Sequence, residues 1–183
     1  MTPKNLPSLK TVTTSPLPRH GFLLACALAL AALTSVSHAA LKPGDAFPAL
    51  DTAQLAGGDL PSSAGKILVV DFWASWCAPC KASFPALGKI AADYAAREVV
   101  LIGVSVDENP AAYAAFVKKQ SPLFPTLHDA RQILVRAVQV PAMPSTYLID
   151  RQGRVRSVHA GYHGDLSDRQ LRAELDALLA EKN

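Results

Sequence analysis

A short apolar run that leads directly into two closely spaced cysteines limits the folds open to this chain. Residues 67–72 read ILVVDF, and Cys77 and Cys80 follow shortly after them. A short, β-branched run without its own periodicity is typical of a strand buried on both faces of a mainly parallel sheet. Asp71 interrupts the run, and a carboxyl group in such a strand must find a partner or stay neutral. We therefore expect a buried strand whose end carries chemistry.

The spacing of the two cysteines indicates a redox pair at the start of a helix. There, Cys77 would face unpaired backbone N–H groups and the positive end of the helix dipole, which lower the pKa of a thiol below roughly 8.5. Cys80 would lie one turn further along the same face, close enough to attack a mixed disulfide formed at Cys77. We expect Cys77 to attack, Cys80 to resolve, and Asp71 to accept the proton of Cys80.

These residues carry a family resemblance. Residues 69–81, VVDFWASWCAPCK, resemble the active-site segment of the thioredoxin superfamily, and more narrowly of its TlpA/ResA-like, bacterial envelope-facing branch. A second match is VPAMPSTYLIDRQG, residues 140–153, and the resemblance extends from Leu41 to the C-terminus. It implies a thioredoxin-like α/β fold with a central mixed sheet flanked by helices. It also implies thiol-disulfide exchange that needs no cofactor besides the Cys77–Cys80 disulfide.

The first 39 residues read as a secretory signal. Three cations precede an apolar run at residues 21–33, and small residues then frame a cut before Ala40. We expect residues 1–39 to be a signal peptide and 40–183 to form the thioredoxin-like domain; an uncleaved membrane anchor is the alternative, although the run is short for a spanning helix. Cys26 would leave with the signal, so both remaining thiols belong to the motif.

The charge composition gives no reason to expect that the domain binds nucleic acid. The formal charge is +3, and the cations of the signal account for the excess. The remaining domain is balanced in charge, so it has no basic surface bias. With 183 residues in all, the chain is long enough for one domain, which we expect to be a monomer.

Periodicity and turn residues predict the rest of the chain in order. Residues 41–65 read as a loop with one or two short edge strands, and a helix that contains Pro85 runs from the cysteines to about Arg97. A second buried strand covers 99–106, and Asn109 caps a helix. The remaining expected elements are an irregular stretch at 121–128, a short helix capped by Asp129, a hairpin of 145–149 and 154–159, and a last helix with a capping box of Ser167 and Gln170. The pieces between the second strand and the hairpin are similar to a TlpA-type insertion.

Five residues are expected to bind substrate. Trp76 and Pro79 belong to the cysteine motif, where Trp76 would form a partly exposed apolar lip, whereas Trp73 would be core. By resemblance, the Met143–Pro144 bond is the cis-proline that faces the cysteines, which leaves the backbone of Met143 free to pair with an extended substrate. By resemblance, the loop that contains Tyr162 forms a third side of this substrate-binding surface.

Two other classes compete with this interpretation. His128, His159 and His163 raise the possibility of a copper or zinc carrier in which thiols and an imidazole are ligands. None of them lies near the cysteine motif in sequence, so each is expected on the surface or in a loop, and no metal is expected. A peroxidatic cysteine would instead need a lone thiol in a frame of proline and threonine.

The chain departs from its family at two positions. ResA-like proteins carry a glutamate three residues after the second cysteine, where this chain has Ser83, and Asp71 stands in the strand as in thioredoxin proper. Proton handling should therefore rest on Asp71, and the two departures leave open which duty the resemblance implies, cytochrome c maturation or envelope redox homeostasis. Because Ala78 and Pro79 bring no positive charge, we expect a periplasmic reductant of protein disulfides that a membrane thiol donor re-reduces.

Overall fold

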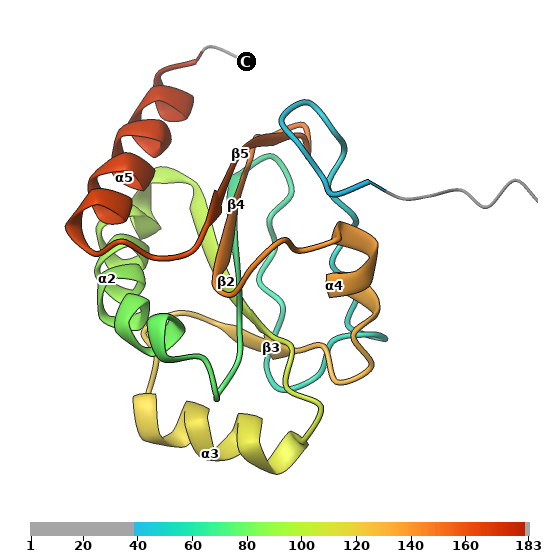
Figure 1. Ribbon diagram of the computed structural model, residues 1–183. Coiled ribbons are helices and arrows are strands. Elements are labelled where there is room, and N and C mark those ends of the chain that lie inside the picture. Colours follow the sequence, from blue (N-terminus) through green and yellow to red (C-terminus); the bar gives the residue numbers. More distant parts are fainter. Residues whose placement is uncertain (1–38, 182–183) are drawn as a thin grey trace, which may run out of the picture. The chain divides into compact units, whose positions relative to one another are not determined.

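The computed structural model describes residues 39–181, which form a five-stranded mixed sheet with helices on both of its faces (Figure 1). The strand order is β3-β2-β1-β4-β5, with β3, β2 and β1 parallel and with β4 and β5 antiparallel to their neighbours. The strands are β1 (Ile67–Trp73), β2 (Val99–Ser105), β3 (Thr126–His128), β4 (Ser145–Ile149) and β5 (Val155–Ala160). The expected fold class is confirmed, and the cysteine motif follows the central strand.

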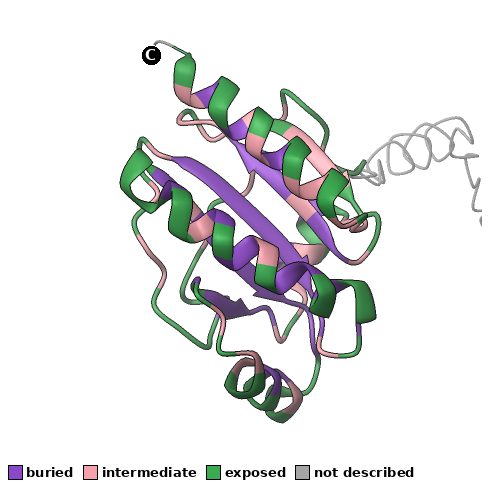
Figure 2. Cartoon of the chain, turned by 90° about the vertical axis from the view of Figure 1, so that its left-hand side faces the viewer, coloured by how far each residue is buried: buried purple, intermediate pink, exposed green. Residues whose placement is uncertain are grey.

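Two long helices cover one face of this sheet and a short helix covers the other (Figure 1). The helices are α2 (Ala78–Tyr94), the 3-10 turn η1 (Ala95–Arg97), α3 (Pro110–Gln120), α4 (Ile133–Val138) and α5 (Asp165–Ala180). Helices α2 and α5 lie side by side, and the Tyr94 hydroxyl of α2 donates to the Asp176 carboxylate of α5 at 3.1 Å. Both turn a buried stripe toward the sheet (Figure 2), as the spacing of their apolar residues predicts.

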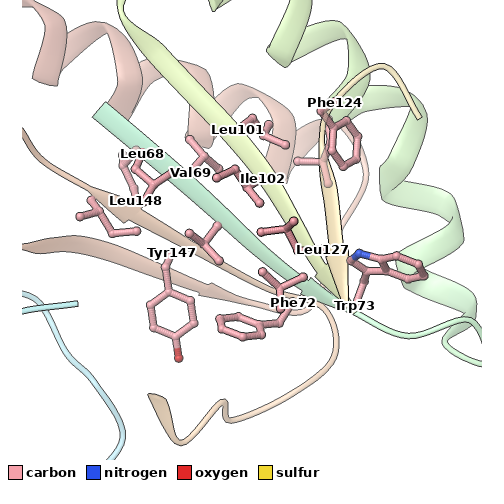
Figure 3. Close-up of a cluster of buried hydrophobic side chains, with 14 of the residues drawn as sticks. Leu68, Val69, Phe72, Trp73, Leu101, Ile102, Phe124, Leu127, Tyr147 and Leu148 are labelled. Atoms are coloured by element: carbon pink, nitrogen blue, oxygen red, sulfur yellow. The ribbon is translucent and has the colours of Figure 1, made fainter. Parts of the chain in front are cut away.

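The sheet is buried on both faces because alternate side chains of each strand enter two separate apolar layers. Phe72 and Tyr147 point to one side and contact each other edge to face, with ring centroids 5.7 Å apart (Figure 3). Trp73 enters the other layer, as expected, and packs on Phe84 of α2. Gly103 leaves room for Trp73, because a Cβ atom at residue 103 would lie 3.0 Å from the indole nitrogen.

Several local predictions are confirmed. The Asn109 side chain accepts from the Ala111 amide and caps α3, and Pro85 lies inside α2. The Asp129 carboxylate accepts from the amides of Ile133 and Val135 in the short helix α4, while the N-cap position itself is held by Gln132 and not by Asp129. The predicted hairpin forms between β4 and β5, with a register irregularity between Leu148 and Ile149.

Three local predictions are wrong. Residues 41–65 contribute only single bridges, Ala46 to Arg154 and Ala56 to His128, in place of edge strands. The stretch 121–128 is not irregular throughout, because residues 126–128 add β3 to the sheet. The capping box is absent: α5 already begins at Asp165, and the Ser167 hydroxyl accepts from the His163 amide before the helix.

Two predictions remain open. The segment between β2 and β4 folds as α3, β3 and α4, and its equivalence to a TlpA-type insertion stays a prediction. The expected signal peptide lies outside the described residues, apart from Ala39. Within residues 39–181, no helix combines the length and the apolar character needed to cross a membrane.

Candidate active site

The cysteine pair lies where the central strand gives way to a helix. After β1, the amide of Cys77 donates to the Ala74 carbonyl at 3.1 Å, which closes a tight turn. Cys77 is the N-cap of α2, and its sulfur accepts a hydrogen bond from the Cys80 amide at 3.2 Å. The two residues are joined by a disulfide, with Cα atoms 5.3 Å apart. The helix start therefore directs a backbone donor at the sulfur of Cys77, as the motif predicts.

Both sulfur-bearing residues are largely covered by the protein. Cys80 is fully buried, whereas Cys77 retains 4% exposure and adjoins Trp76, whose side chain is exposed. A nucleophile has to meet a partner at the surface, while a resolving thiol acts within the protein. The difference in burial is consistent with the predicted order, in which Cys77 attacks and Cys80 resolves.

A buried aspartate that the sequence reasoning missed fixes the turn before the cysteines. The carboxylate of Asp107 accepts from the Ser75 amide at 3.0 Å and from the Ser75 hydroxyl at 2.8 Å. It also accepts from the hydroxyl of Ser105 at 2.8 Å, at the end of β2. Polar residues directly after a buried parallel strand were the available signal, because such strand ends lie at one edge of the sheet.

Asp71 is buried in β1 with one hydrogen-bond partner. Thr146 lies opposite it on β4 and donates from its hydroxyl to Oδ1 of Asp71 at 2.7 Å. The other oxygen, Oδ2, has no partner among the described residues. Burial raises the pKa of Asp71 to about 7, because the charged form is poorly solvated, and the Thr146 bond opposes this increase. A carboxyl group with this pKa can take up or release a proton near neutrality.

A small cavity connects the surroundings of Asp71 to those of Cys80. Thr146 and Ser83 both line it, and the Ser83 hydroxyl donates to the Cys80 carbonyl at 2.9 Å. Its volume of about 20 Å³ is enough for one water molecule. The cavity therefore lies between Ser83, which follows Cys80 in α2, and Thr146, the hydrogen-bond partner of Asp71.

The expected substrate-binding residues fall into two groups. Met143–Pro144 is a cis peptide bond, and Pro144 lines the same cavity as Tyr162. Residue 145 pairs with Phe72, so Pro144 lies beside the end of β1 from which the cysteine turn departs. Trp76 and Pro79 are exposed next to the disulfide in sequence. Their roles in binding stay predictions.

The expectation that the three histidines lie on the surface or in loops is wrong for His128. His128 belongs to β3, is buried and stacks on Tyr113 with ring centroids 4.6 Å apart. His159 belongs to β5 and contacts Glu174 of α5 at 2.7 Å. Only His163 is exposed in a loop. The burial of His128 was missed because residues 121–128 were expected to be irregular, whereas residues 126–128 form β3.

Comparison with known proteins points to one family. The AhpC/TSA family model matches residues 43–158 of the chain. Similar proteins include the thiol-disulfide oxidoreductase ResA of Oceanobacillus iheyensis, 29% identical over 126 residues, and ResA of Bacillus subtilis, 31% identical over 103 residues. These matches cover 66% and 56% of this chain, and only 66% and 58% of the respective relatives, which is less than two thirds of their length.

A solved structure shares the fold over its whole length. The crystal structure of a Chlorobium tepidum protein, proposed to be the thiol:disulfide interchange protein DsbE, superimposes with a TM-score of 0.70 and 29% identity. The match covers 77% of this chain and 100% of that one. With the cysteine pair at the start of α2 and these relatives, the chain belongs to the AhpC/TSA family and is a TlpA/ResA-like member of the thioredoxin superfamily.

Proposed function

We propose that this protein is a thiol-disulfide oxidoreductase that reduces disulfide bonds in exported proteins through the Cys77/Cys80 dithiol. The observation that carries the proposal is the disulfide at the start of α2, with the sulfur of Cys77 accepting a backbone hydrogen bond beside the exposed Trp76. The names of the relatives, ResA and DsbE, agree with this chemistry. They do not favour the copper or zinc carrier.

The reaction begins with the reduced protein. The thiolate of Cys77 attacks one sulfur of a substrate disulfide, which forms a mixed disulfide and releases the first substrate thiolate. Cys80 then loses its proton to Asp71, directly or through water, and its sulfur attacks Cys77. The second substrate thiolate leaves, and the Cys77–Cys80 disulfide remains. Two electrons have passed to the substrate, and no cofactor takes part.

The site geometry supports a proton-accepting role for Asp71. A base works best when its pKa lies near the working pH, and burial brings the pKa of Asp71 to about 7. The cavity lined by Ser83 and Thr146 has room for one water, and we propose that such a water carries the proton from Cys80 toward Asp71. Ser83 itself cannot act as the base, because a hydroxyl does not ionise near neutrality.

The surroundings of Cys77 favour a reductant over an oxidant. A better stabilised thiolate favours the reduced form and makes the disulfide more oxidising. Ala78 and Pro79 bring no positive charge, and Pro79 has no N–H to donate to the sulfur. After each reaction the Cys77–Cys80 disulfide must be reduced again, and we propose that a thiol donor in the membrane supplies these electrons. The residues proposed to hold the substrate are Trp76, Pro79, Met143, Pro144 and Tyr162.

The proposed location is the periplasm. It rests on the order of charged, apolar and small residues in segment 1–39, which would be cut before Ala40, as mass analysis of the exported protein would check. An uncleaved signal would instead tether the domain to the membrane. Within this compartment we propose a duty in redox homeostasis, with cytochrome c maturation as a narrower candidate. The protein is proposed to act as a monomer.

Trapping of the mixed disulfide tests this function. Cys80→Ser keeps the attacking thiol and removes the resolving one, so exported proteins should remain bound to Cys77 and be released by a reducing agent. Cys77→Ser is the matched control, because it keeps one thiol in the same motif but should trap almost nothing. Mass spectrometry of the trapped proteins names the substrates. Trapping by Cys77→Ser alone would reverse the roles, and trapping by neither variant would refute the proposed reductase.

A further inference from the structure

A row of polar side chains crosses the sheet from the buried aspartate to its edge. Asp71 on β1 pairs in register with Thr146 on β4, and Thr146 pairs with His159 on β5. Side chains of directly opposed residues in antiparallel strands point to the same face. Because neighbouring strands lie about 4.8 Å apart, the backbones of Asp71 and His159 are only about 10 Å apart.

His159 is tied to an acidic residue at the surface end of this row. Its Nε2 atom lies 2.7 Å from Oε2 of Glu174, and the Ser157 hydroxyl donates to the same oxygen. The side chain of His159 is 13% exposed, and that of Glu174 is 30% exposed. A neutral histidine that donates from Nε2 to a carboxylate keeps a lone pair on Nδ1, which can accept a proton.

The small cavity next to Ser83 also extends along Thr146 and His159. Both residues line it, and the other groups with polar side chains around it are Ser83 of α2, Tyr162 and the α5 residues Ser167 and Asp168. No lysine or arginine lines it. Its volume of about 20 Å³ suits one water molecule that could bond to Thr146 and to the imidazole. Hydroxyl, water and imidazole are the groups from which proteins build proton routes.

We propose that His159, held by Glu174, is the solvent end of a proton route that connects Asp71 to the surface through Thr146 and a water in the cavity. The proposal rests on the proposed role of Asp71 as the acceptor of the Cys80 proton. In each cycle Asp71 must lose that proton before it can accept another. A buried carboxyl group without such an exit would depend on rare opening of the sheet and helices around it.

The proton balance follows from the hydrogen bonds. After the resolving step, protonated Asp71 donates to the hydroxyl oxygen of Thr146, and the hydroxyl donates its own proton to the water. The water protonates Nδ1 of His159, which becomes an imidazolium ion while its Nε2–H bond to Glu174 stabilises the charge. The imidazolium releases one proton to solvent. One proton leaves Cys80 and one reaches solvent, and no oxidant or reductant is needed.

The test measures repeated reduction of a small aromatic disulfide under excess thiol donor, at a pH near 7, where Asp71 must exchange its proton in every turnover. His159→Ala should lower the turnover rate about tenfold, which is less than the 10²–10⁴ range for loss of a general base itself. Free imidazole should restore the rate in proportion to its concentration, because it can enter where the side chain was removed. His163→Ala is the matched control: this exposed histidine lies in the loop after β5, and its removal should change nothing.

A second pair of variants separates a proton route from mere packing. Thr146→Val keeps the shape but removes the hydroxyl, so it should slow turnover to a similar extent and should not respond to imidazole. Thr146→Ser keeps the hydroxyl and should retain most of the wild-type rate. If His159→Ala unfolds the edge of the sheet, the two Thr146 variants still test the proton route.

The outcomes distinguish this inference from the proposed function. A wild-type rate in His159→Ala, or a reduced rate that imidazole does not restore, would overturn the route through His159. If Asp71→Asn released a trapped mixed disulfide as fast as the wild type, the role of Asp71 would fail and the route with it. If Asp71→Asn were slow while Thr146→Val and His159→Ala were both normal, Asp71 would keep its role and only the route would be refuted.

Discussion

At the residue scale, the buried Asp71 makes stability depend on pH. Its pKa is about 7 in the folded protein, against 3.8 for an aspartate exposed to water. Between these values the folded state holds a proton that the unfolded state has lost, so stability falls as pH rises from about 4 to 7. Above pH 7 the folded protein carries the full free-energy cost of an ionised, buried Asp71. A shift of this size corresponds to on the order of 4 kcal/mol, at about 1.4 kcal/mol per pKa unit.

We therefore expect Asp71→Asn to stabilise the oxidised protein at high pH. The amide has the same shape and never ionises, so at pH 9 the variant should be more stable than the wild type by about 1–4 kcal/mol. At pH 3 the two proteins should have similar stability, since Asp71 is then protonated in both the folded and the unfolded state. Urea unfolding at both pH values measures the difference, with the exposed Asp59→Asn as the control. Equal stability at pH 9 would mean that Asp71 ionises without cost.

The sequence predicted the residues of the site that lie in one local motif. Cys77, Cys80 and Asp71 belong to one strand and one helix start, so their relation follows from local spacing. Thr146 and His159 could not be found in this way, because only the register of three neighbouring strands aligns them with Asp71. Register depends on the packing of the whole sheet, which a single sequence does not specify residue by residue.

At the scale of elements, the turn between β1 and α2 depends on a strand end far away in sequence. Asp107 follows β2 and receives two hydrogen bonds from Ser75 in the turn, while a third comes from Ser105. These bonds hold the turn that sets the position of Cys77. A buried carboxylate satisfied by three donors is costly to replace, because its partners lose their acceptor.

Asp107→Asn should therefore loosen the active-site turn. An amide directs an NH₂ group toward donors that need an acceptor, so we expect a loss of about 1–3 kcal/mol in the free energy of unfolding. The reaction of Cys77 with iodoacetamide should also slow in the reduced protein, because the sulfur is no longer held at the helix start. Asp129→Asn is the comparison: this buried aspartate follows the neighbouring strand β3, and its carboxylate bonds α4 rather than the turn. Unchanged Cys77 reactivity in Asp107→Asn would contradict this role.

Element boundaries were predictable where one signal dominates. Asn109 and the proline that follows it predict the start of α3, and the apolar run predicts β1. The strand β3 was missed because its three residues follow two prolines, and its place in the sheet comes from pairing with β2. The supposed capping box failed because Asp165 and the Gly164 turn begin α5 two residues earlier than Ser167.

At the scale of the whole molecule, the proposed function depends on the direction of electron flow. The same fold can serve a reductant or an oxidant, and the difference lies in how strongly the protein stabilises the Cys77 thiolate. One backbone donor reaches this sulfur, from Cys80, and the two residues between the cysteines are uncharged. A nearby Asp71 that ionises would disfavour the thiolate further. These features all favour a reducing potential.

The reduction potential of the Cys77–Cys80 pair decides whether the protein is a reductant or an oxidant. The protein is equilibrated with glutathione buffers of graded ratio, and the fraction of free thiol is measured after acid quenching. We expect a potential more negative than about −200 mV, in the range of reductants rather than near the roughly −120 mV of a strong oxidant. Pro79→His serves as the internal comparison and should raise the potential, because it places a positive charge and an N–H beside the sulfur. A wild-type pair that stays mostly reduced in buffers that oxidise ordinary reductants would show an oxidant and contradict the account.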